Sequence, residues 1–189
     1  MIHGYTLTDT KDAQGSKQEI FERANAQFGF VPNIINAFSE SPVLANAMLD
    51  LYTRLGDTNL SFVESHVVLQ TINVQNKCTY CVPAHSTIAR SKGVDTGLDE
   101  ALRVQHRLDD PKLEALRLFT SQMVEQRGHF DDGQFQAFLE AGYTREHALE
   151  VIYLHTVKTL TNYGNHLAGT DLDKPFQALE WTPEEAVAV

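Results

Sequence analysis

The sequence predicts an all-α protein, a compact bundle of several helices. Three observations carry this prediction. Helix-capping residues recur along the whole chain. Prolines and glycines stand mainly where helices would begin or end. No stretch of four to eight residues alternates apolar and polar residues in the way a half-buried strand does.

The first expected helices follow recognisable starts. Ser16 with Glu19 has the spacing of a capping box, in which each side chain bonds the other residue's backbone N–H. Ser41 before Pro42 places a cap ahead of a proline in the first helical turn, and Gly56 stands where that helix would stop.

The later helices are predicted by the same kinds of residues. Asp110 precedes Pro111, and Asp131 and Thr144 each suit the start of a further helix. Gly93 and Gly142 suit helix ends. The expected helices lie near residues 16–27, 33–39, 42–55, 61–75, 80–92, 96–107, 111–127, 132–141, 145–166 and 173–180.

The length of 189 residues suits one domain with a sizeable core, and we expect residues 1–189 to form a single helical domain. Two packed helical halves joined near Asp109-Asp110-Pro111 would also fit. The tail after Trp181 is expected to be loose, because little in it could anchor it.

Composition argues against several classes of partner. The net charge is −10, and the sequence contains no run of Lys or Arg. We therefore expect no nucleic acid to bind. The N-terminus lacks the pattern of a signal peptide, and no apolar stretch is long enough for a membrane span. We therefore expect a cytoplasmic protein with no membrane contact.

Only two cysteines occur, Cys78 and Cys81, which are too few to staple a secreted fold of this size. In the segment Cys78-Thr79-Tyr80-Cys81-Val82-Pro83-Ala84-His85, Pro83 belongs in the first turn of a helix, because elsewhere its missing N–H would break the hydrogen-bond ladder. The helix therefore begins near Tyr80. Cys81 then lies in the first turn, where free N–H groups and the helix dipole favour a thiolate.

His85 follows Cys81 by four residues and so shares its helix face, within reach of the sulfur directly or through a water. This spacing suggests a nucleophile and its base. The thiolate would attack a peroxide oxygen and form a sulfenic acid, and the neighbouring thiol would condense with it to a disulfide that an external dithiol reduces.

Other roles for the two cysteines and His85 are less well supported by the sequence. A single cysteine is often a small buried apolar residue, but two at this spacing before a histidine favour redox chemistry. Zinc would need a second ligand pair at finger spacing, which is missing, so we expect no metal and no cofactor. A thioredoxin site would follow a strand, whereas the segment before Cys78 has a helical pattern.

The chain resembles the carboxymuconolactone decarboxylase superfamily, and within it the alkylhydroperoxidase D-like, peroxidase-related branch. The likeness covers about residues 28–176. The segments that carry it are Gly29-Phe30-Val31-Pro32-Asn33, Asn76 to His85, Ala141-Gly142-Tyr143-Thr144 and Asn162-Tyr163-Gly164-Asn165-His166.

The resemblance implies a compact helical fold that assembles into trimers or hexamers. It also implies that Cys81 is the peroxidatic cysteine and Cys78 the resolving one. The substrate would be a small hydroperoxide, and the reductant an external dithiol or a lipoyl-type group.

Two departures from the family concern proton transfer. Family members carry a relay glutamate twelve residues before the first cysteine, where this chain has His66, while Glu64 lies two residues earlier. Two residues on a helix are about 200° apart, so His66 and Glu64 cannot both face one site on a regular helix. We keep both as candidates. Tyr80 replaces a relay histidine and cannot shuttle protons near neutral pH, so we expect weaker peroxidase turnover than is usual for the family.

The long helix near 145–166 carries His155, Thr159, Asn162 and His166 at helical spacing, which we interpret as a packed polar seam or a subunit contact. Two alternative functions stay open. One is a lyase like the lactone decarboxylase of the superfamily, and the other is a non-catalytic redox sensor or assembly protein.

Overall fold

The all-α prediction is confirmed in a computed structural model that describes residues 1–186, among which no strand occurs. The helices are α1 (Ser16–Phe28), α2 (Asn33–Phe38), α3 (Pro42–Thr53), α4 (Phe62–Gln75), α5 (Cys81–Ser91), α6 (Thr96–Arg103), α7 (Pro111–Gln126), α8 (Asp132–Glu140) and α9 (Arg145–Ala168). Short 3₁₀ helices are η1 (Leu55–Asp57), η2 (Lys174–Leu179) and η3 (Pro183–Glu185). None of these helices is both long and apolar enough to cross a membrane.

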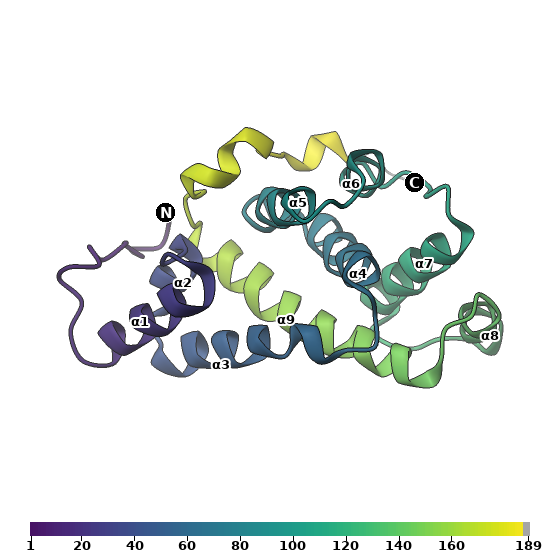
Figure 1. The fold of residues 1–189 in the computed structure, drawn as a ribbon, viewed down its shortest axis with the longest axis horizontal. Helices are drawn as coiled ribbons and strands as arrows, with labels where there is room; N and C mark the ends of the chain where they lie inside the picture. Colours follow the sequence, from purple (N-terminus) through teal and green to yellow (C-terminus); the bar gives the residue numbers. More distant parts are fainter. Residues whose placement is uncertain (187–189) are drawn as a thin grey trace.

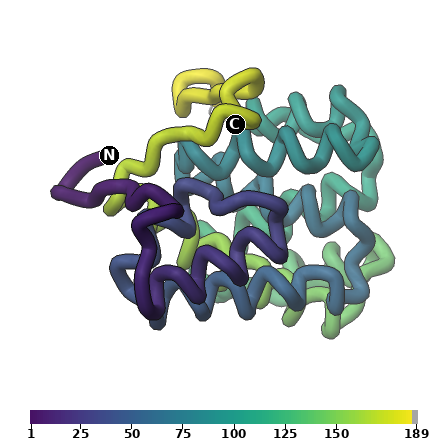
Figure 2. The backbone as a smooth tube through the Cα atoms, turned by 60° about the vertical axis from the view of Figure 1, so that its left-hand side comes forward, coloured from purple at the N-terminus to yellow at the C-terminus, as the bar shows by residue number. Residues whose placement is uncertain are grey.

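The long helix α9 runs diagonally through the middle of the molecule, with α3 beside it and α4 packed across it (Figure 1). Helices α1 and α2 lie at one end, and α6, α7 and α8 at the other (Figure 1). The segment after α9 turns back and runs along α5, and the tube in Figure 2 shows it passing close to the N-terminus.

Two large groups of buried side chains fill most of the molecule, and a small third one consists of Val74, Val82 and Trp181. One large group lies among α1, α2 and α3 and includes Cys78 and Cys81; the other lies among α4, α6, α7 and α8. Helix α9 contributes to both, with Leu154 in the second and Ala168 in the first. Leu108 and Leu116, on either side of Asp109-Asp110-Pro111, belong to the same group, so no boundary between the groups falls there.

Most of the predicted caps are confirmed. Ser41 and Asp110 accept hydrogen bonds from the first turns of α3 and α7, and Asp131 and Thr144 form capping boxes. The Ser16 prediction is wrong, because α1 begins at Ser16 itself and no side chain caps it.

Helix α6 ends earlier than the sequence predicts. It stops at Arg103 because Gln105 adopts a left-handed backbone with φ of 57°, which closes the helix end. The residue just before the predicted loose tail is held by the fold. Trp181 is buried, its indole N–H donates to the Arg103 carbonyl, and the Thr182 N–H donates to the Glu185 carboxylate at 2.7 Å. Residues 187–189 of the predicted loose tail lie outside the described residues.

Candidate active site

The turn between α4 and α5 holds the first cysteine in place. After α4 ends at Gln75, Lys77 adopts a left-handed backbone with φ of 54°. The Lys77 N–H bonds the Val74 carbonyl and the Cys78 N–H bonds the Asn73 carbonyl, the two bonds of a Schellman helix end. Cys78 is thereby fixed just before α5, with no surface exposed to solvent.

Cys81 is the first residue of α5, as the position of Pro83 predicts. Its backbone N–H points at the Cys78 sulfur, 3.3 Å away. Both thiols are free in this structure, and no disulfide joins them. A short shift of one side chain would allow a bond, since residues this close in a turn meet the spacing that a disulfide needs.

The strongest charge beside Cys81 comes from Lys158 on α9, which is completely buried. Burial alone would raise the pKa of Cys81. The hydrogen bond from Cys78, the charge of Lys158 and hydrogen bonds from α9 outweigh it and lower that pKa to about 6. The surroundings of Cys81 therefore favour the thiolate over the neutral thiol.

Cys78 has the opposite character. Burial and the neighbouring Cys81 thiolate raise its pKa well above the ordinary value. The Asn165 amide donates a weak hydrogen bond to its sulfur, at 3.6 Å. The pair thus consists of one ionised sulfur and one neutral thiol, which are the states required of an attacking and a resolving cysteine.

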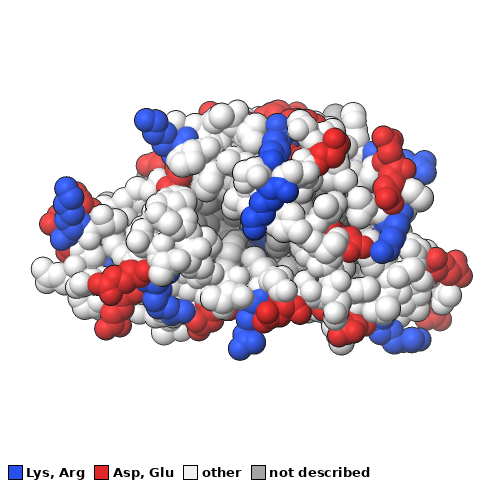
Figure 3. Space-filling model, in the orientation of Figure 1, with Lys and Arg blue, Asp and Glu red and all other residues white. Residues whose placement is uncertain are grey.

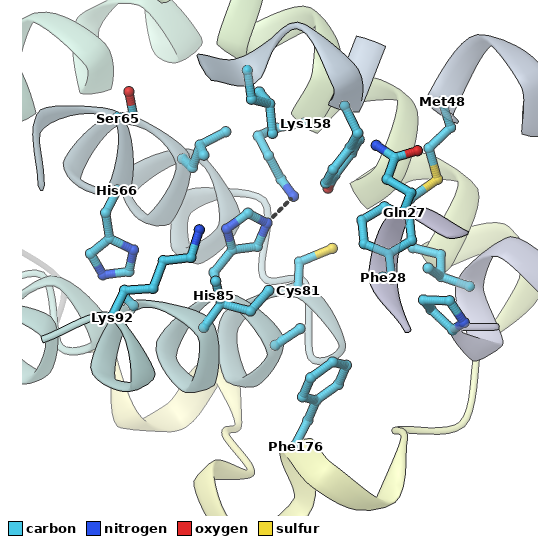
Figure 4. Close-up of a pocket in the computed structure, with 18 of the residues that line it drawn as sticks. Gln27, Phe28, Met48, Ser65, His66, Cys81, His85, Lys92, Lys158 and Phe176 are labelled. Carbon is cyan, nitrogen blue, oxygen red and sulfur yellow. Dashed lines mark hydrogen bonds between the residues drawn. The ribbon is translucent and has the colours of Figure 1, made fainter. Parts of the chain in front are cut away.

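His85 lines the same cavity but forms no hydrogen bond with Cys81 within the described chain. Its Nε2 lies 2.9 Å from the Lys158 ammonium instead (Figure 4). Burial and then the charges of Lys158 and His66 lower its pKa well below the ordinary value, so the ring is neutral. Lys158 therefore contacts His85 and also carries a charge that acts on Cys81, while the predicted link of His85 to the Cys81 sulfur, directly or through a water, stays a prediction.

A chain of buried amides supports the two cysteines from α4 and α9. Asn162 donates to Asn73 at 3.0 Å, Asn73 to Gln70 at 3.1 Å, and Gln70 to Ser86 at 2.9 Å. Asn76 donates to Asn162 at 2.9 Å. Satisfied buried networks of this kind hold their members rigidly, so the turn between α4 and α5 keeps one geometry.

His66 also lines the cavity, as the predicted site role requires. Its Nε2 lies 2.9 Å from Asp99, a fully buried carboxylate that also accepts from Ser86 and Arg90. Burial raises the pKa of Asp99, but hydrogen bonds with His66 and Arg90 outweigh this and lower it. The bond to Asp99 fixes the orientation of the His66 ring.

Glu64 is placed elsewhere, so the prediction that it joins the site is corrected. Its carboxylate closes a capping box with Ser61 at the start of α4 and pairs with Lys112 at 3.0 Å. It is absent from the cavity wall. Glu64 and His66 point in different directions because they are two residues apart on a regular helix.

Tyr80 precedes Cys81 and donates a hydrogen bond to Asp173, which also accepts from the Asn33 N–H at 3.1 Å. Burial and the charge of Asp173 raise the pKa of Tyr80 well above the ordinary value. Tyr80 thus anchors the start of α5 to the segment after α9 and stays protonated.

The Cys81 sulfur points into a cavity of about 740 Å³ (Figure 4). The space-filling view shows a hollow near the middle of this face, with Lys and Arg side chains at its rim (Figure 3). The wall is mainly aromatic and aliphatic, and includes Phe28, Phe30, Met48, Tyr52, Phe62 and Phe176. Such a wall suits an apolar organic molecule.

Lys158 is not among the predicted site residues, although its position in the sequence carries a signal. It lies on the inner face of α9, four residues from Leu154 and from Asn162, both fully buried. A lysine on the apolar stripe of a long helix needs a buried partner. Of the predicted polar seam on α9, Asn162 is buried in the amide network, whereas His166 is exposed. Among residues 1–186 no group of three or more His, Cys, Asp or Glu side chains could hold a metal ion.

No protein-family model and no curated protein matches the chain. Several solved structures are similar to it. The alkylhydroperoxidase AhpD core of a peroxidase-related protein from Ralstonia eutropha has a TM-score of 0.79 at 20% identity, over 91% of this chain and 93% of that one. A peroxidase-related protein from Silicibacter sp. has a TM-score of 0.76 at 20% identity, over 92% of each chain.

The debrominase Bmp8 is also similar. A variant with one cysteine replaced by alanine, in complex with 2,3,4-tribromopyrrole, has a TM-score of 0.74 at 21% identity, over 94% of this chain and 96% of that one. These likenesses show that the chain has the AhpD-core fold, as the resemblance in sequence implies.

Proposed function

We propose that this protein is a thiol-dependent peroxidase that reduces organic hydroperoxides through Cys81 and Cys78. One observation carries the proposal: a buried ammonium and a first-turn position keep Cys81 ionised where its sulfur faces an apolar cavity. The fold similarity to two peroxidase-related proteins supports the same reaction class.

In the first step the Cys81 thiolate attacks the outer oxygen of the hydroperoxide. An S–O bond forms, the O–O bond breaks, and the alkoxide that leaves takes up a proton. The Lys158 ammonium, which acts on Cys81 through its charge and contacts His85, is suited to supply this proton. Lys158 is thus suited to stabilise the thiolate before the attack and the leaving oxygen during it.

In the second step the Cys78 sulfur attacks the sulfenic sulfur of Cys81. The S–S bond forms and water leaves, so the two cysteines have supplied the two electrons that reduce the peroxide to an alcohol and water. An external dithiol, such as a lipoyl-type group, then reduces the disulfide by exchange. A reducing cytoplasm would sustain this cycle.

The test follows thiols and peroxide together. Reduced protein is mixed with a stoichiometric amount of cumene hydroperoxide, and free thiols, disulfide and peroxide are measured over time. We expect one disulfide for each peroxide consumed. Cys81→Ser should abolish rapid consumption, and Cys78→Ser should stop after one turnover with a sulfenic acid that dimedone traps. Peroxide consumption by Cys81→Ser at the parent rate would refute the proposal.

A second candidate is reductive dehalogenation of an aromatic ring, favoured by the aromatic lining of the cavity and by the fold of the debrominase. Here a carbon–bromine bond would become carbon–hydrogen. Bromide would leave, a proton would be taken up, and the two thiols would supply two electrons as they form the disulfide. Release of bromide from a brominated pyrrole, faster than peroxide reduction and dependent on Cys81, would favour this candidate.

The remaining alternatives make different predictions. A lactone decarboxylase would stay active after alkylation of both thiols, since its proton transfers need no cysteine. A redox sensor would change its oligomeric size between the reduced and oxidised states and would show no peroxide turnover.

A further inference from the structure

The cavity beside Cys81 has an unusual charge for this protein. The chain carries a net charge of −10, yet no Asp or Glu lines the cavity. The ionisable groups of its wall include two lysines, Lys92 and Lys158, and two histidines, His66 and His85. A cationic, otherwise apolar cavity in an acidic protein favours an anionic ligand with an apolar body.

One of the two lysines is already neutralised. Lys158 is fully buried, and the charge of the Cys81 thiolate opposes the loss of solvation that burial imposes on it. The ammonium and the thiolate balance each other, so Lys158 leaves no net charge for a substrate before the reaction.

Lys92 is the cation that remains. It follows the last residue of α5, and its ammonium lies over the Phe62 ring, 4.8 Å from the ring centre. Within residues 1–186 no carboxylate lies within 4 Å of it, whereas Glu100 and Asp99 both pair with Arg90 nearby. Its side chain contributes to the cavity wall and is drawn with it in Figure 4.

We propose that the substrate is a hydroperoxide that carries a carboxylate, such as a fatty-acid hydroperoxide, and that Lys92 binds this carboxylate. The substrate's apolar chain would lie along the wall between Lys92 and Cys81, with the peroxide at the sulfur. This assignment rests on the proposed peroxidase function and adds the substrate class to it.

The geometry of α5 sets the distance between the carboxylate and the peroxide of the bound substrate. Lys92 lies eleven residues after Cys81, which places their backbones roughly 16 Å apart along the helix. Helical side chains lean toward the N-terminus, so the ammonium lies nearer to Cys81 than its backbone does. A peroxide separated from the carboxylate by a chain of several carbons fits this span, whereas a compact peroxy acid does not.

The test compares linoleic acid hydroperoxide with its methyl ester, which have the same apolar chain and peroxide but differ in charge. We expect kcat/KM to be at least about tenfold higher for the acid than for the ester. Lys92→Met should bring that ratio close to one, and Lys92→Arg should largely restore it. Lys174→Met removes an equal charge from an exposed site outside the cavity and should keep the parent ratio.

Equal rates for acid and ester in the parent protein, or an unchanged ratio in Lys92→Met, would overturn the proposal. Failure of the peroxidase function would look different, because neither compound would then oxidise the thiols. In that case the binding of the corresponding hydroxy acid is measured by calorimetry. A roughly tenfold weaker affinity in Lys92→Met supports the anion site, and an unchanged affinity overturns it.

Discussion

The Lys158 ammonium lies 2.9 Å from Nε2 of His85, which joins α9 to α5 across the cavity. A lysine ammonium can only donate, so Nε2 must accept and the proton of the neutral imidazole lies on Nδ1. The bond therefore fixes the tautomer of His85. It also holds the positive charge of Lys158 beside the first turn of α5, where Cys81 begins the helix.

Replacing Lys158 with methionine should make Cys81 much less reactive. The side chain keeps its approximate length but loses the positive charge that, after the hydrogen bond from Cys78, contributes most to lowering the pKa of the thiol to about 6. If the pKa returned to the ordinary value of about 8.5, the thiolate fraction at pH 7 would fall from about nine-tenths to a few per cent. We expect alkylation of Cys81 by iodoacetamide at pH 7 to slow by at least about tenfold.

Lys158→Arg is the matched control, because it keeps a positive charge at the same position. It should retain more of the parent rate than Lys158→Met. Both variants should be checked for folding by circular dichroism and thermal unfolding. Equal alkylation rates in folded Lys158→Met and parent protein would show that another group ionises Cys81.

The reactivity of Cys81 should depend on pH in a way that an ordinary thiol does not. The thiolate is the reacting form, so the rate should be low well below pH 6, half-maximal near pH 6 and level at neutral pH. Cys78 should react only at much higher pH, since its pKa is raised. Mass spectrometry of the alkylated peptides separates the two cysteines. A midpoint for Cys81 above pH 8 would contradict the assigned electrostatics.

Local sequence signals predicted much of the site. The position of Pro83 places Cys81 at the start of α5, and helical spacing places His85 on the cavity wall. Lys158 was missed because its role depends on contact between α5 and α9, which lie far apart in the sequence. The contact between Lys158 and His85 is unpredictable for the same reason, because Lys158 comes from a helix that is distant in the sequence.

The fold was predicted well wherever one residue decides the conformation. Proline and capping residues located the starts of α3, α7, α8 and α9. The ends were less predictable. Gln105 and Lys77 are not glycines, yet both adopt left-handed conformations that end helices. Their conformations are set by helix-end hydrogen bonds and tertiary packing, which residue type alone does not reveal.

Glu64→Ala should reduce stability and leave the thiol chemistry unchanged. The variant loses the capping box with Ser61 and the ion pair with Lys112, which together we expect to cost about 1 kcal/mol, because partial exposure screens the pair. Thermal or urea unfolding measures this loss. The rate of Cys81 alkylation should stay within about twofold of the parent rate, and a larger fall would return Glu64 to the site.

Glu64 should also make the stability of the protein depend on pH in the acidic range. Burial raises the pKa of Glu64, but hydrogen bonds from Ser61 and Lys112 outweigh it and lower that pKa to about 2. A carboxyl group with a lower pKa in the folded state than in the unfolded state stabilises the fold at any pH above its unfolded-state pKa. This stabilisation is lost as the pH falls toward the folded-state pKa. The stability difference between parent and Glu64→Ala should therefore shrink between about pH 4.5 and pH 2.

Gly164→Ala should disturb the packing of α9 against α2. A Cβ atom at residue 164 would lie 2.3 Å from the Phe38 ring, which is buried and cannot move away freely. Overpacking of this kind typically costs about 1–3 kcal/mol. Urea unfolding should show that loss. Gly56→Ala is the control, because a Cβ atom there meets nothing within 4 Å. Equal stability of the two variants would contradict the close approach of α9 and α2.

The outer face of α9 should mediate self-association. Leu149, Ile152, Tyr163 and Leu167 are between 46% and 67% exposed and repeat at helical spacing. From residue 152 to residue 167 the helix has no acidic residue, so two copies of this negatively charged chain could meet there without bringing their acidic groups together. The occupant that we predict is a second copy of the chain, in the trimer or hexamer that the family resemblance implies.

Light scattering and sedimentation should therefore show an oligomer at micromolar concentration, and Ile152→Glu combined with Tyr163→Glu should dissociate it. Leu118→Glu places a charge on an equally exposed apolar site of α7 and should leave the mass unchanged. A monomeric parent protein, or a double variant with the parent's mass, would show that α9 is not the contact. Because Lys158 lies on the inner face of the same helix, the dissociated variant should also be assayed for Cys81 alkylation. An unchanged rate would show that assembly and thiol activation are carried by separate faces of α9.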